Sequence, residues 1–168
     1  MTADNTHRER LAGLQPGTRA RITALLDRMV EIGKTQPWRP VVTSGFRSPA
    51  AQEQLFKKGR EPRVERVGDK VTTRWVPGGP ERIVTKARCW ESAHCFGLAA
   101  DIALVDDETS AWVRDGDEGW LRLHDEAAAL GLETGHLWRF VDSAHVQEPA
   151  WQATVRDEIE AMERRFGP

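Results

Sequence analysis

The chain has 168 residues, enough for one domain to bury a core without disulfide bonds. Hydrophobic residues make up 39% of it and charged residues 30%, a composition that excludes a disordered chain. The net charge of -2, from 24 Lys and Arg against 26 Asp and Glu, gives no electrostatic indication of nucleic acid or an anionic membrane as a partner.

The first predicted helix covers residues 18–32, where apolar residues recur at the spacing of one buried helical face. Thr18 is placed to cap its start and Gly33 to end it. The β-rich run PVVTSGF, residues 40–46, is then expected to form a short strand.

A second helix is expected directly after this strand. Ser48 is its N-cap, Pro49 occupies its first turn and Gly59 closes it. Arg47 therefore lies at a strand-to-helix corner, where side chains commonly project into a functional site. Residues 64–76 alternate between apolar and polar types around a Gly-Asp dipeptide, which predicts a β-hairpin.

The remaining segments predict an α+β fold, because helices and strands follow one another without a regular alternation. The acidic tract 106–119 lacks the ligand spacing of a calcium loop and is expected to be a solvated loop. The further predicted elements are strands at 81–88, 98–105 and 137–147 and helices at 120–131 and 151–166.

The chain shows no targeting or membrane signal. Residues 1–17 contain no apolar segment of a signal peptide, and the longest apolar run is far shorter than the roughly 20 residues of a membrane span. We expect synthesis in the cytoplasm, no membrane insertion, and a monomer with a single domain over residues 1–168. Cys89 and Cys95 are too few for a disulfide framework and are expected to be reduced packing residues.

The stretch SAHCFGLAAD places His94 and Asp101 seven positions apart around Gly97. Seven residues span about 23 Å when extended and about 10 Å in a helix, whereas zinc holds its ligand atoms at about 2.0–2.2 Å. A shared metal site therefore requires a turn between the two side chains, which Gly97 can make. By themselves, such a pair of residues is more often a loop histidine and an aspartate at the end of a strand than two metal ligands.

A catalytic zinc site usually has a third protein ligand and an open position. The remaining histidines are His7, His124, His136 and His145. His145 has the most suitable surroundings, because Asp142 lies three residues before it and can reach the same ion as a base. A D-x-x-H pattern alone is more often a cap followed by a surface histidine.

Three stretches occur in the order SGFRSPAAQEQLFKKGR, SAHCFGLAAD and GLETGHLWRFVDSAHVQ. Together they resemble the zinc D-alanyl-D-alanine carboxypeptidases and L-alanyl-D-glutamate endopeptidases that cut peptidoglycan stem peptides, over about residues 11–147. The resemblance implies the hedgehog/DD-peptidase fold, a small central and mainly antiparallel sheet flanked by helices. Residues 61–76, which include the predicted hairpin, are expected to be an insertion into that fold.

Carried over by position, the resemblance implies one zinc ion held by His94, Asp101 and His145. Asp142 would be the general base, and Arg47 would hold the scissile carbonyl oxygen as negative charge develops on it. The residues expected to contact the substrate are Ser92, Gln52, His136 and Trp138.

The chain departs from the family pattern near the third ligand, where Thr134 and His136 replace the usual tryptophan and second glycine. Cys95 directly follows a ligand, where a polar residue is common. A thiol nucleophile at Cys95 with His94 as its base is an alternative. It is disfavoured because adjacent side chains point apart and a metal ligand cannot also serve as a free base.

These features predict a zinc metallopeptidase that hydrolyses peptidoglycan stem peptides, an L-alanyl-D-glutamate endopeptidase that acts as a phage-type endolysin. Without a signal peptide it is expected to act on the cell wall, in the periplasm, after release that depends on another protein such as a holin. Two alternatives stay open. One is a D-alanyl-D-alanine carboxypeptidase, and the other is a zinc-stabilised binding module without activity, against which Asp142 and Arg47 argue.

Overall fold

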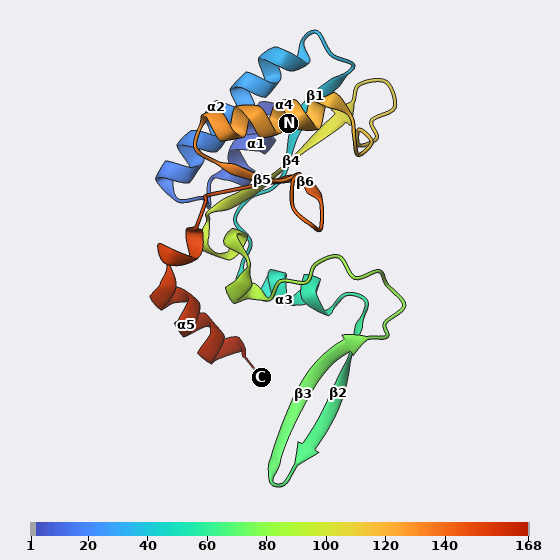
Figure 1. The fold of residues 1–168 in the computed structure, drawn as a ribbon, viewed down its shortest axis with the longest axis vertical. Helices are drawn as coiled ribbons and strands as arrows, with labels where there is room; N and C mark the ends of the chain where they lie inside the picture. Colours follow the sequence, from blue (N-terminus) through green and yellow to red (C-terminus); the bar gives the residue numbers. More distant parts are fainter. Residues whose placement is uncertain (1–2, 168) are drawn as a thin grey trace.

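The computed structural model describes residues 3–167 and contains a four-stranded sheet with helices packed against it (Figure 1). The helices are α1 (Ala3–Leu11), α2 (Pro16–Gly33), α3 (Pro49–Lys57), α4 (Glu118–Ala129) and α5 (Arg156–Phe166), with short 3-10 helices η1 (Cys89–Glu91), η2 (Ala93–Phe96) and η3 (Trp151–Ala153). The strands are β1 (Trp38–Ser44), β2 (Arg60–Val67), β3 (Lys70–Pro77), β4 (Ala99–Asp106), β5 (Glu133–Gly135) and β6 (Asp142–Gln147).

The main sheet has the strand order β1-β4-β6-β5, and every neighbouring pair is antiparallel. β2 and β3 form a separate two-stranded ribbon. The predicted α+β class, with a mainly antiparallel sheet flanked by helices, is therefore confirmed. Within residues 3–167, no helix has both the length and the apolar character needed to cross a membrane.

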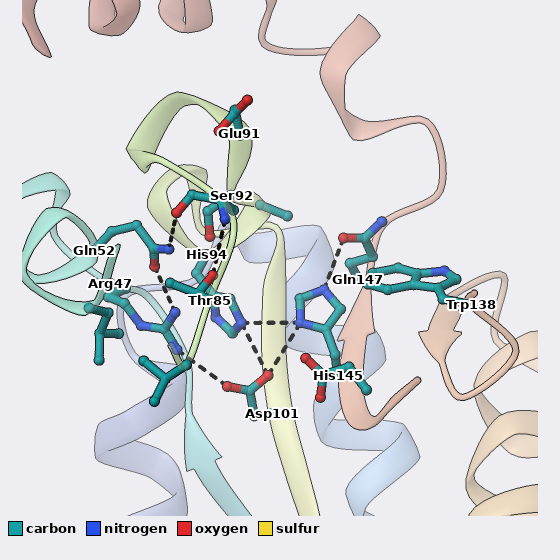
Figure 2. Close-up of a pocket in the computed structure, with 15 residues that line it drawn as sticks. Arg47, Gln52, Thr85, Glu91, Ser92, His94, Asp101, Trp138, His145 and Gln147 are labelled. Atoms are coloured by element: carbon teal, nitrogen blue, oxygen red, sulfur yellow. Dashed lines mark hydrogen bonds and ion pairs between the residues drawn. The ribbon is translucent and has the colours of Figure 1, made fainter. Parts of the chain in front are cut away.

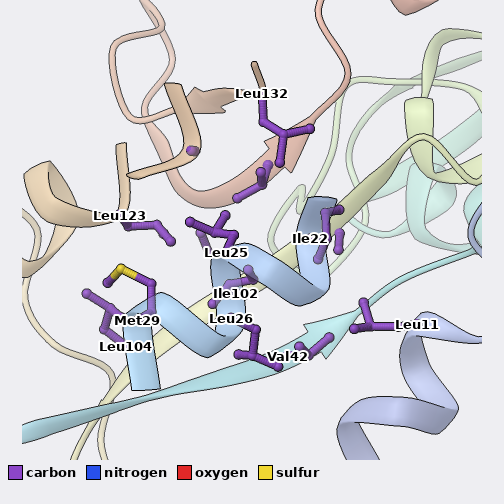
Figure 3. Packing of buried hydrophobic residues seen from close by; sticks show 14 of the residues in the cluster. Leu11, Ile22, Leu25, Leu26, Met29, Val42, Ile102, Leu104, Leu123 and Leu132 are labelled. Carbon is purple, nitrogen blue, oxygen red and sulfur yellow. The ribbon is translucent and has the colours of Figure 1, made fainter. Parts of the chain in front are cut away.

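The hydrophobic core lies between the main sheet and the helices α2 and α4 (Figure 3). Ile22, Leu25 and Met29 share one face of α2 and are fully buried. They pack with Ile102 and Leu104 of β4. Burial of each of these side chains stabilises the folded state by about 1.5–3 kcal/mol. The core therefore fixes β4, whose alternate side chains point to the opposite face of the sheet.

Several local predictions are confirmed. The hydroxyl of Ser48 accepts the N–H of Ala51 at 3.2 Å and so caps α3. The hairpin forms and is longer than expected, since β2 and β3 pair from Arg60 with Pro77 to Val67 with Lys70. The core strand at 98–105 is β4, and the helix predicted at 120–131 is α4.

The expected N-cap at Thr18 is wrong. α2 begins two residues earlier, because Pro16 suits the first turn of a helix and removes an N–H that would have no partner there. Thr18 is buried inside the helix instead, and its hydroxyl donates to Glu148 at 2.8 Å. The hydroxyl of Thr18 therefore links α2 to a residue near the far end of the chain and does not cap its own helix.

The strand predicted at 81–88 is also wrong. This segment is irregular and joins no ladder in the described chain, and its carbonyl groups accept from side chains. Thr85 accepts from Arg60 at 3.0 Å, and Ala87 accepts from Gln52 at 2.9 Å. These bonds hold the segment as a wall beside α3.

Three further boundaries differ from expectation. In the strand predicted at 137–147 only β6 is regular, since 137–141 is an exposed bend. The helix predicted at 151–166 is divided into η3 and α5. The sequence patterns also missed α1 and β5, which are a weakly amphipathic helix and a strand of three residues.

Glu53 of α3 anchors the segment that leads into η1. Its carboxylate accepts from Arg88 Nε at 2.8 Å and from the N–H of Cys89 at 3.0 Å. Arg88 also donates to the carbonyl of Phe166 at 2.8 Å, which ties α5 to the same point. Burial raises the pKa of Glu53, but the hydrogen bonds from Arg88 and Cys89 outweigh it, so the pKa lies below its ordinary value of 4.5.

Replacing Glu53 with Gln is expected to lower the free energy of unfolding by about 2 kcal/mol at neutral pH, because Arg88 would lose its buried counter-charge. Since the folded pKa lies below the unfolded one, the carboxylate stabilises the fold above the ordinary pKa and loses this effect as the pH falls through the folded pKa. Urea unfolding of both proteins at neutral pH and near pH 3.5 should therefore show a difference that shrinks in acid.

Glu31→Gln is the matched control, because Glu31 pairs with Lys34 on the exposed surface. Its effect should stay below about 0.5 kcal/mol at both pH values. An equal loss for Glu53→Gln at neutral and acid pH would contradict the role assigned to the Glu53 charge.

Candidate metal centre

His94 reaches the centre because the chain turns at Gly97. Gly97 has a φ of +68°, and the N–H of Leu98 donates to the carbonyl of Ala93 at 3.0 Å, which ends η2. A Cβ at this position would lie 2.9 Å from the carbonyl oxygen of Gly13, so both the conformation and the space favour glycine. The turn that the spacing of His94 and Asp101 requires is therefore present.

The register of the main sheet brings Asp101 and His145 together. They are direct partners in the antiparallel ladder between β4 and β6. Opposed side chains on one face of such a pair lie about 4.5–5.5 Å apart at their Cβ atoms. Since Ile102 faces the core, its neighbour Asp101 points away from it and toward the site.

The three predicted ligands converge on one point (Figure 2). His94 Nε2 lies 3.1 Å from Asp101 Oδ1 and 3.3 Å from His145 Nδ1. His145 Nδ1 also lies 3.3 Å from Asp101 Oδ1. A tetrahedral zinc ion with ligands at about 2.0–2.1 Å separates its donor atoms by about 3.3–3.4 Å, so these three atoms fit three corners of its coordination sphere.

The other histidines lie elsewhere. Among the described residues, His94, Asp101 and His145 form the one group of three or more His, Cys, Asp or Glu side chains close enough to share a metal ion. His124 Nδ1 contacts the hydroxyl of Thr134 at 2.9 Å instead. Of the four histidines considered as a third ligand, His145 is the one that lies beside His94 and Asp101 in this group.

Hydrogen bonds behind the site fix which ring nitrogens face it. His94 Nδ1 donates to the carbonyl of Gly45 at 2.8 Å, which leaves Nε2 toward the centre. His145 Nε2 donates to the amide oxygen of Gln147 at 2.9 Å, and the amide nitrogen of Gln147 donates to Glu133. Such outer partners set the tautomer and orientation of metal-binding histidines.

Sequence reasoning missed Gln147 and Glu133. One local signal existed, because Gln147 lies two positions after His145 and therefore on the same face of the strand. Glu133 becomes visible only through the pairing of β5 with β6, where it lies opposite Gln147.

The electrostatics of the centre favour positive charge. Burial raises the pKa of Asp101, but its hydrogen bonds with His145 and His94 lower the pKa by more, so that it lies below its ordinary range. Burial lowers the pKa of His145, but its hydrogen bond to Asp101 and the negative charge of that residue raise the pKa above its ordinary value. Three electron-pair donors that face one another need a cation between them, and a divalent metal would supply that charge.

The five residues predicted to be ligands, base and charge clamp all line one cavity of about 360 Å³: His94, Asp101, His145, Asp142 and Arg47. Three of the expected substrate contacts, Ser92, Gln52 and Trp138, line it as well. The ring of Trp138 lies 5.2 Å from that of His145 (Figure 2). His136 is not among the lining residues, and its Nδ1 contacts the hydroxyl of Ser143 at 3.2 Å.

Arg47 is held in the cavity by its neighbours. Nη1 donates to Gln52 at 2.7 Å, and Nη2 donates to Ser44 at 2.9 Å and to Asp101 at 3.3 Å. Its backbone N–H donates to the carbonyl of His94 at 3.1 Å. The amide of Gln52 is also bound to Ala87, so the structure gives Gln52 the role of positioning Arg47.

Asp142 is the first residue of β6 and keeps an exposed side chain at the rim of the cavity. Partial burial raises its pKa, and the negative charge of Asp101 raises it further, while His145, His94 and Arg47 act in the opposite direction. The net pKa lies above the ordinary value, which makes this carboxylate a stronger base than a solvated one.

Cys95 is buried and free. Burial raises the pKa of its thiol to about 11, although the charge of Arg47 opposes this. The thiol is therefore protonated at neutral pH, which argues against a nucleophile beside His94. Cys89 is also free and buried, with a pKa of about 12, so both cysteines fit the expected reduced packing role.

One family model, one relative and one solved structure are similar to this chain. The family model "VanY: D-alanyl-D-alanine carboxypeptidase" matches residues 16–153. The peptidoglycan L-alanyl-D-glutamate endopeptidase CwlK of Bacillus subtilis (strain 168) is 35% identical over 115 residues, which cover 64% of this chain and 59% of that protein. The crystal structure of the vancomycin resistance D,D-pentapeptidase VanY in complex with Zn(II) aligns with a TM-score of 0.42 and 16% identity, over 84% of this chain and 81% of that one.

Replacing Gln147 with Ala is expected to weaken zinc binding about 10- to 100-fold, because His145 would lose the acceptor that orients its ring. Competition with a chromophoric chelator measures the zinc affinity without any substrate. Gln152→Ala, the same change at an exposed position, is the control and should leave the affinity unchanged. If both variants bound zinc as the wild type does, Gln147 would have no positioning role.

Proposed function

The chain belongs to the VanY family of D-alanyl-D-alanine carboxypeptidases, and from this premise we propose that it is a zinc peptidase that hydrolyses peptidoglycan stem peptides. The observation that carries the proposal is the spacing of His94 Nε2, Asp101 Oδ1 and His145 Nδ1, which fits tetrahedral zinc. An acid–base residue and a cation, Asp142 and Arg47, line the same cavity.

The bond we propose is the L-alanyl-D-glutamate bond. The identity to CwlK favours this bond, whereas the description of the family favours terminal D-alanine as a second candidate. The matched part spans 59% of CwlK, so the scissile bond is carried over as a proposal and not as a property of this chain. The phage-type lysin role and holin-dependent release belong to the same proposal and rest on the resemblance in sequence.

The side chains divide the chemistry between them. Zinc bound by the three ligands would polarise the scissile carbonyl and acidify the attacking water. Asp142 takes up the proton of that water at its carboxylate and delivers it to the leaving amine nitrogen. Arg47 donates to the carbonyl oxygen as negative charge develops there, and Gln52 and Ser44 keep the guanidinium in place for this contact.

The alternative of a binding module without activity is less well supported. Such a module needs the three metal ligands but neither a base nor a cation in the cavity. Asp142 has a raised pKa and Arg47 is held in the cavity by three side chains, and a module that only binds zinc has no use for either feature.

Replacing Asp142 with Ala should leave bound zinc unchanged and lower the rate of hydrolysis by about 10²- to 10⁴-fold, because the proton acceptor is lost while the ligands stay. Metal analysis and hydrolysis of a soluble stem peptide measure the two effects separately. His145→Ala is the contrasting variant and should lose zinc and activity together. Near-normal hydrolysis by Asp142→Ala would remove the base assignment.

Digestion of purified peptidoglycan, with and without a zinc chelator, tests the proposed function and the bond. We expect chelator-sensitive release of peptides that begin with glutamate, with L-alanine left on the glycan. Release of D-alanine alone would identify the carboxypeptidase instead. If zinc-loaded protein releases no product, the binding module without activity is the remaining alternative.

A further inference from the structure

The β2–β3 hairpin is a large feature that the metal centre does not use. Its two strands extend away from the main sheet and the helices (Figure 1), and most of its side chains are exposed. It is anchored at its base, where Lys57 lies 5.0 Å from the ring centre of Trp75 and Arg60 donates to the carbonyl of Thr85. An isolated two-stranded ribbon is marginally stable and leaves its edges open. A feature that adds so little to the core calls for a partner outside the chain.

Positive charge is concentrated around this hairpin. Residues 57–88 contain ten Lys and Arg against four Asp and Glu, whereas the rest of the chain contains fourteen against twenty-two. A protein with a net charge of -2 therefore has a strongly positive segment and a negative remainder. Such a distribution attracts an anion to one region of the surface.

Four exposed cations of the hairpin have no counter-charge. Within residues 3–167, no ion pair or hydrogen bond holds the side chains of Arg63, Arg66, Lys70 or Arg74. The strand register places Arg63 directly opposite Arg74, and like charges at opposed positions destabilise a hairpin. An anion that binds between these two residues would relieve their repulsion.

The base of the hairpin is continuous with the cavity wall. α3, which precedes the hairpin, contributes Gln52 and Leu55 to the cavity, and the segment that follows it contributes Val84 and Thr85. A strand of eight residues extends for roughly 25 Å, so the hairpin reaches well beyond the cavity. A polymer with one segment in the cavity would therefore continue past the hairpin.

We propose that the β2–β3 hairpin is a docking arm for the peptidoglycan polymer. Arg63, Arg66, Lys70 and Arg74 bind the carboxylates of stem peptides that neighbour the one in the cavity. This inference rests on the proposed function, because that function places a carboxylate-rich polymer at the cavity. Arginine suits such a partner, since its planar fork binds a carboxylate through two parallel hydrogen bonds.

A lipid surface fits the hairpin less well. The tip consists of Gly68, Asp69 and Lys70, none of them aromatic, and the exposed valines Val64 and Val71 behind it are too few and too small for a membrane anchor. The large aromatic residue of the ribbon, Trp75, lies at its base under Lys57 and not at its free end.

The test measures binding to insoluble peptidoglycan sacculi that have been freed of protein and phosphate polymers, so that carboxylates are their anionic groups. The fourfold variant R63Q/R66Q/K70Q/R74Q is compared with the fourfold variant R28Q/K34Q/R39Q/R122Q, which removes the same charge from residues in exposed ion pairs outside the hairpin. Both carry Asp142→Ala, so that the sacculi stay intact. The hairpin variant should bind about tenfold more weakly at low salt and depend less on salt, whereas the control should resemble the parent.

Sacculi whose carboxylates have been converted to amides provide the second arm. The parent protein should bind them as weakly as the hairpin variant binds untreated sacculi. Equal binding of the parent and the hairpin variant to untreated sacculi would overturn the proposal. So would a hairpin-dependent binding to phosphatidylglycerol vesicles with unchanged binding to sacculi.

The result is separable from the proposed function. Hydrolysis of a short soluble stem peptide, measured without Asp142→Ala, reports on the cavity and on folding of the fourfold variants. If the peptide is cleaved but the hairpin variant binds sacculi as well as the parent does, only the docking-arm proposal is wrong. Absence of cleavage by zinc-loaded wild-type protein would sink the peptidase.

Discussion

The structure depends on holding three electron-pair donors within 3.3 Å of one another. Two neutral imidazole nitrogens and a carboxylate oxygen repel when they face a common point, and without a cation a proton must enter between them. The fold orients the two rings through a hydrogen bond at the nitrogen of each ring that faces away from the site. Gly45 takes the hydrogen bond of His94 and Gln147 takes that of His145, so the two rings enter the site with their free nitrogens forward.

The rest of the fold keeps these donors in register. Asp101 and His145 are fixed by their pairing across β4 and β6, which the core on the other face of β4 holds in place. His94 lies outside the sheet and needs separate support. The corner before α3 supplies it through two reciprocal bonds, since Gly45 accepts from the His94 ring and the His94 carbonyl accepts from the Arg47 backbone. One short corner therefore positions both the proposed ligand His94 and the proposed charge clamp Arg47.

What the sequence could predict follows the range of the interactions. Ser48 caps its own helix and Gly97 turns its own loop, so local chemistry is sufficient for both. The sequence pattern wrongly predicts Thr18 as a helix N-cap, because its actual partner, Glu148, lies at the far end of the chain. The ligand set needed the resemblance to a family, since spacing permits His94 and Asp101 to share an ion but cannot choose among the other histidines. Gln147 and Glu133 could not be predicted from the sequence, because their contact forms only once β5 has paired with β6.

The charges of the cavity explain why recognition of a polymer would lie outside it. Among the described lining residues Arg47 is the single Lys or Arg, and its guanidinium already binds Asp101, Ser44 and Gln52. The negative side chains there match the charge that a divalent ion and Arg47 bring, so no positive charge is left over for further carboxylates of a substrate. A cavity of this kind can act on one peptide bond but cannot collect a polyanion. The cations that could do so stand on the hairpin, where water screens them and binding stays reversible, and this separates the capture of the polymer from the chemistry on its peptide.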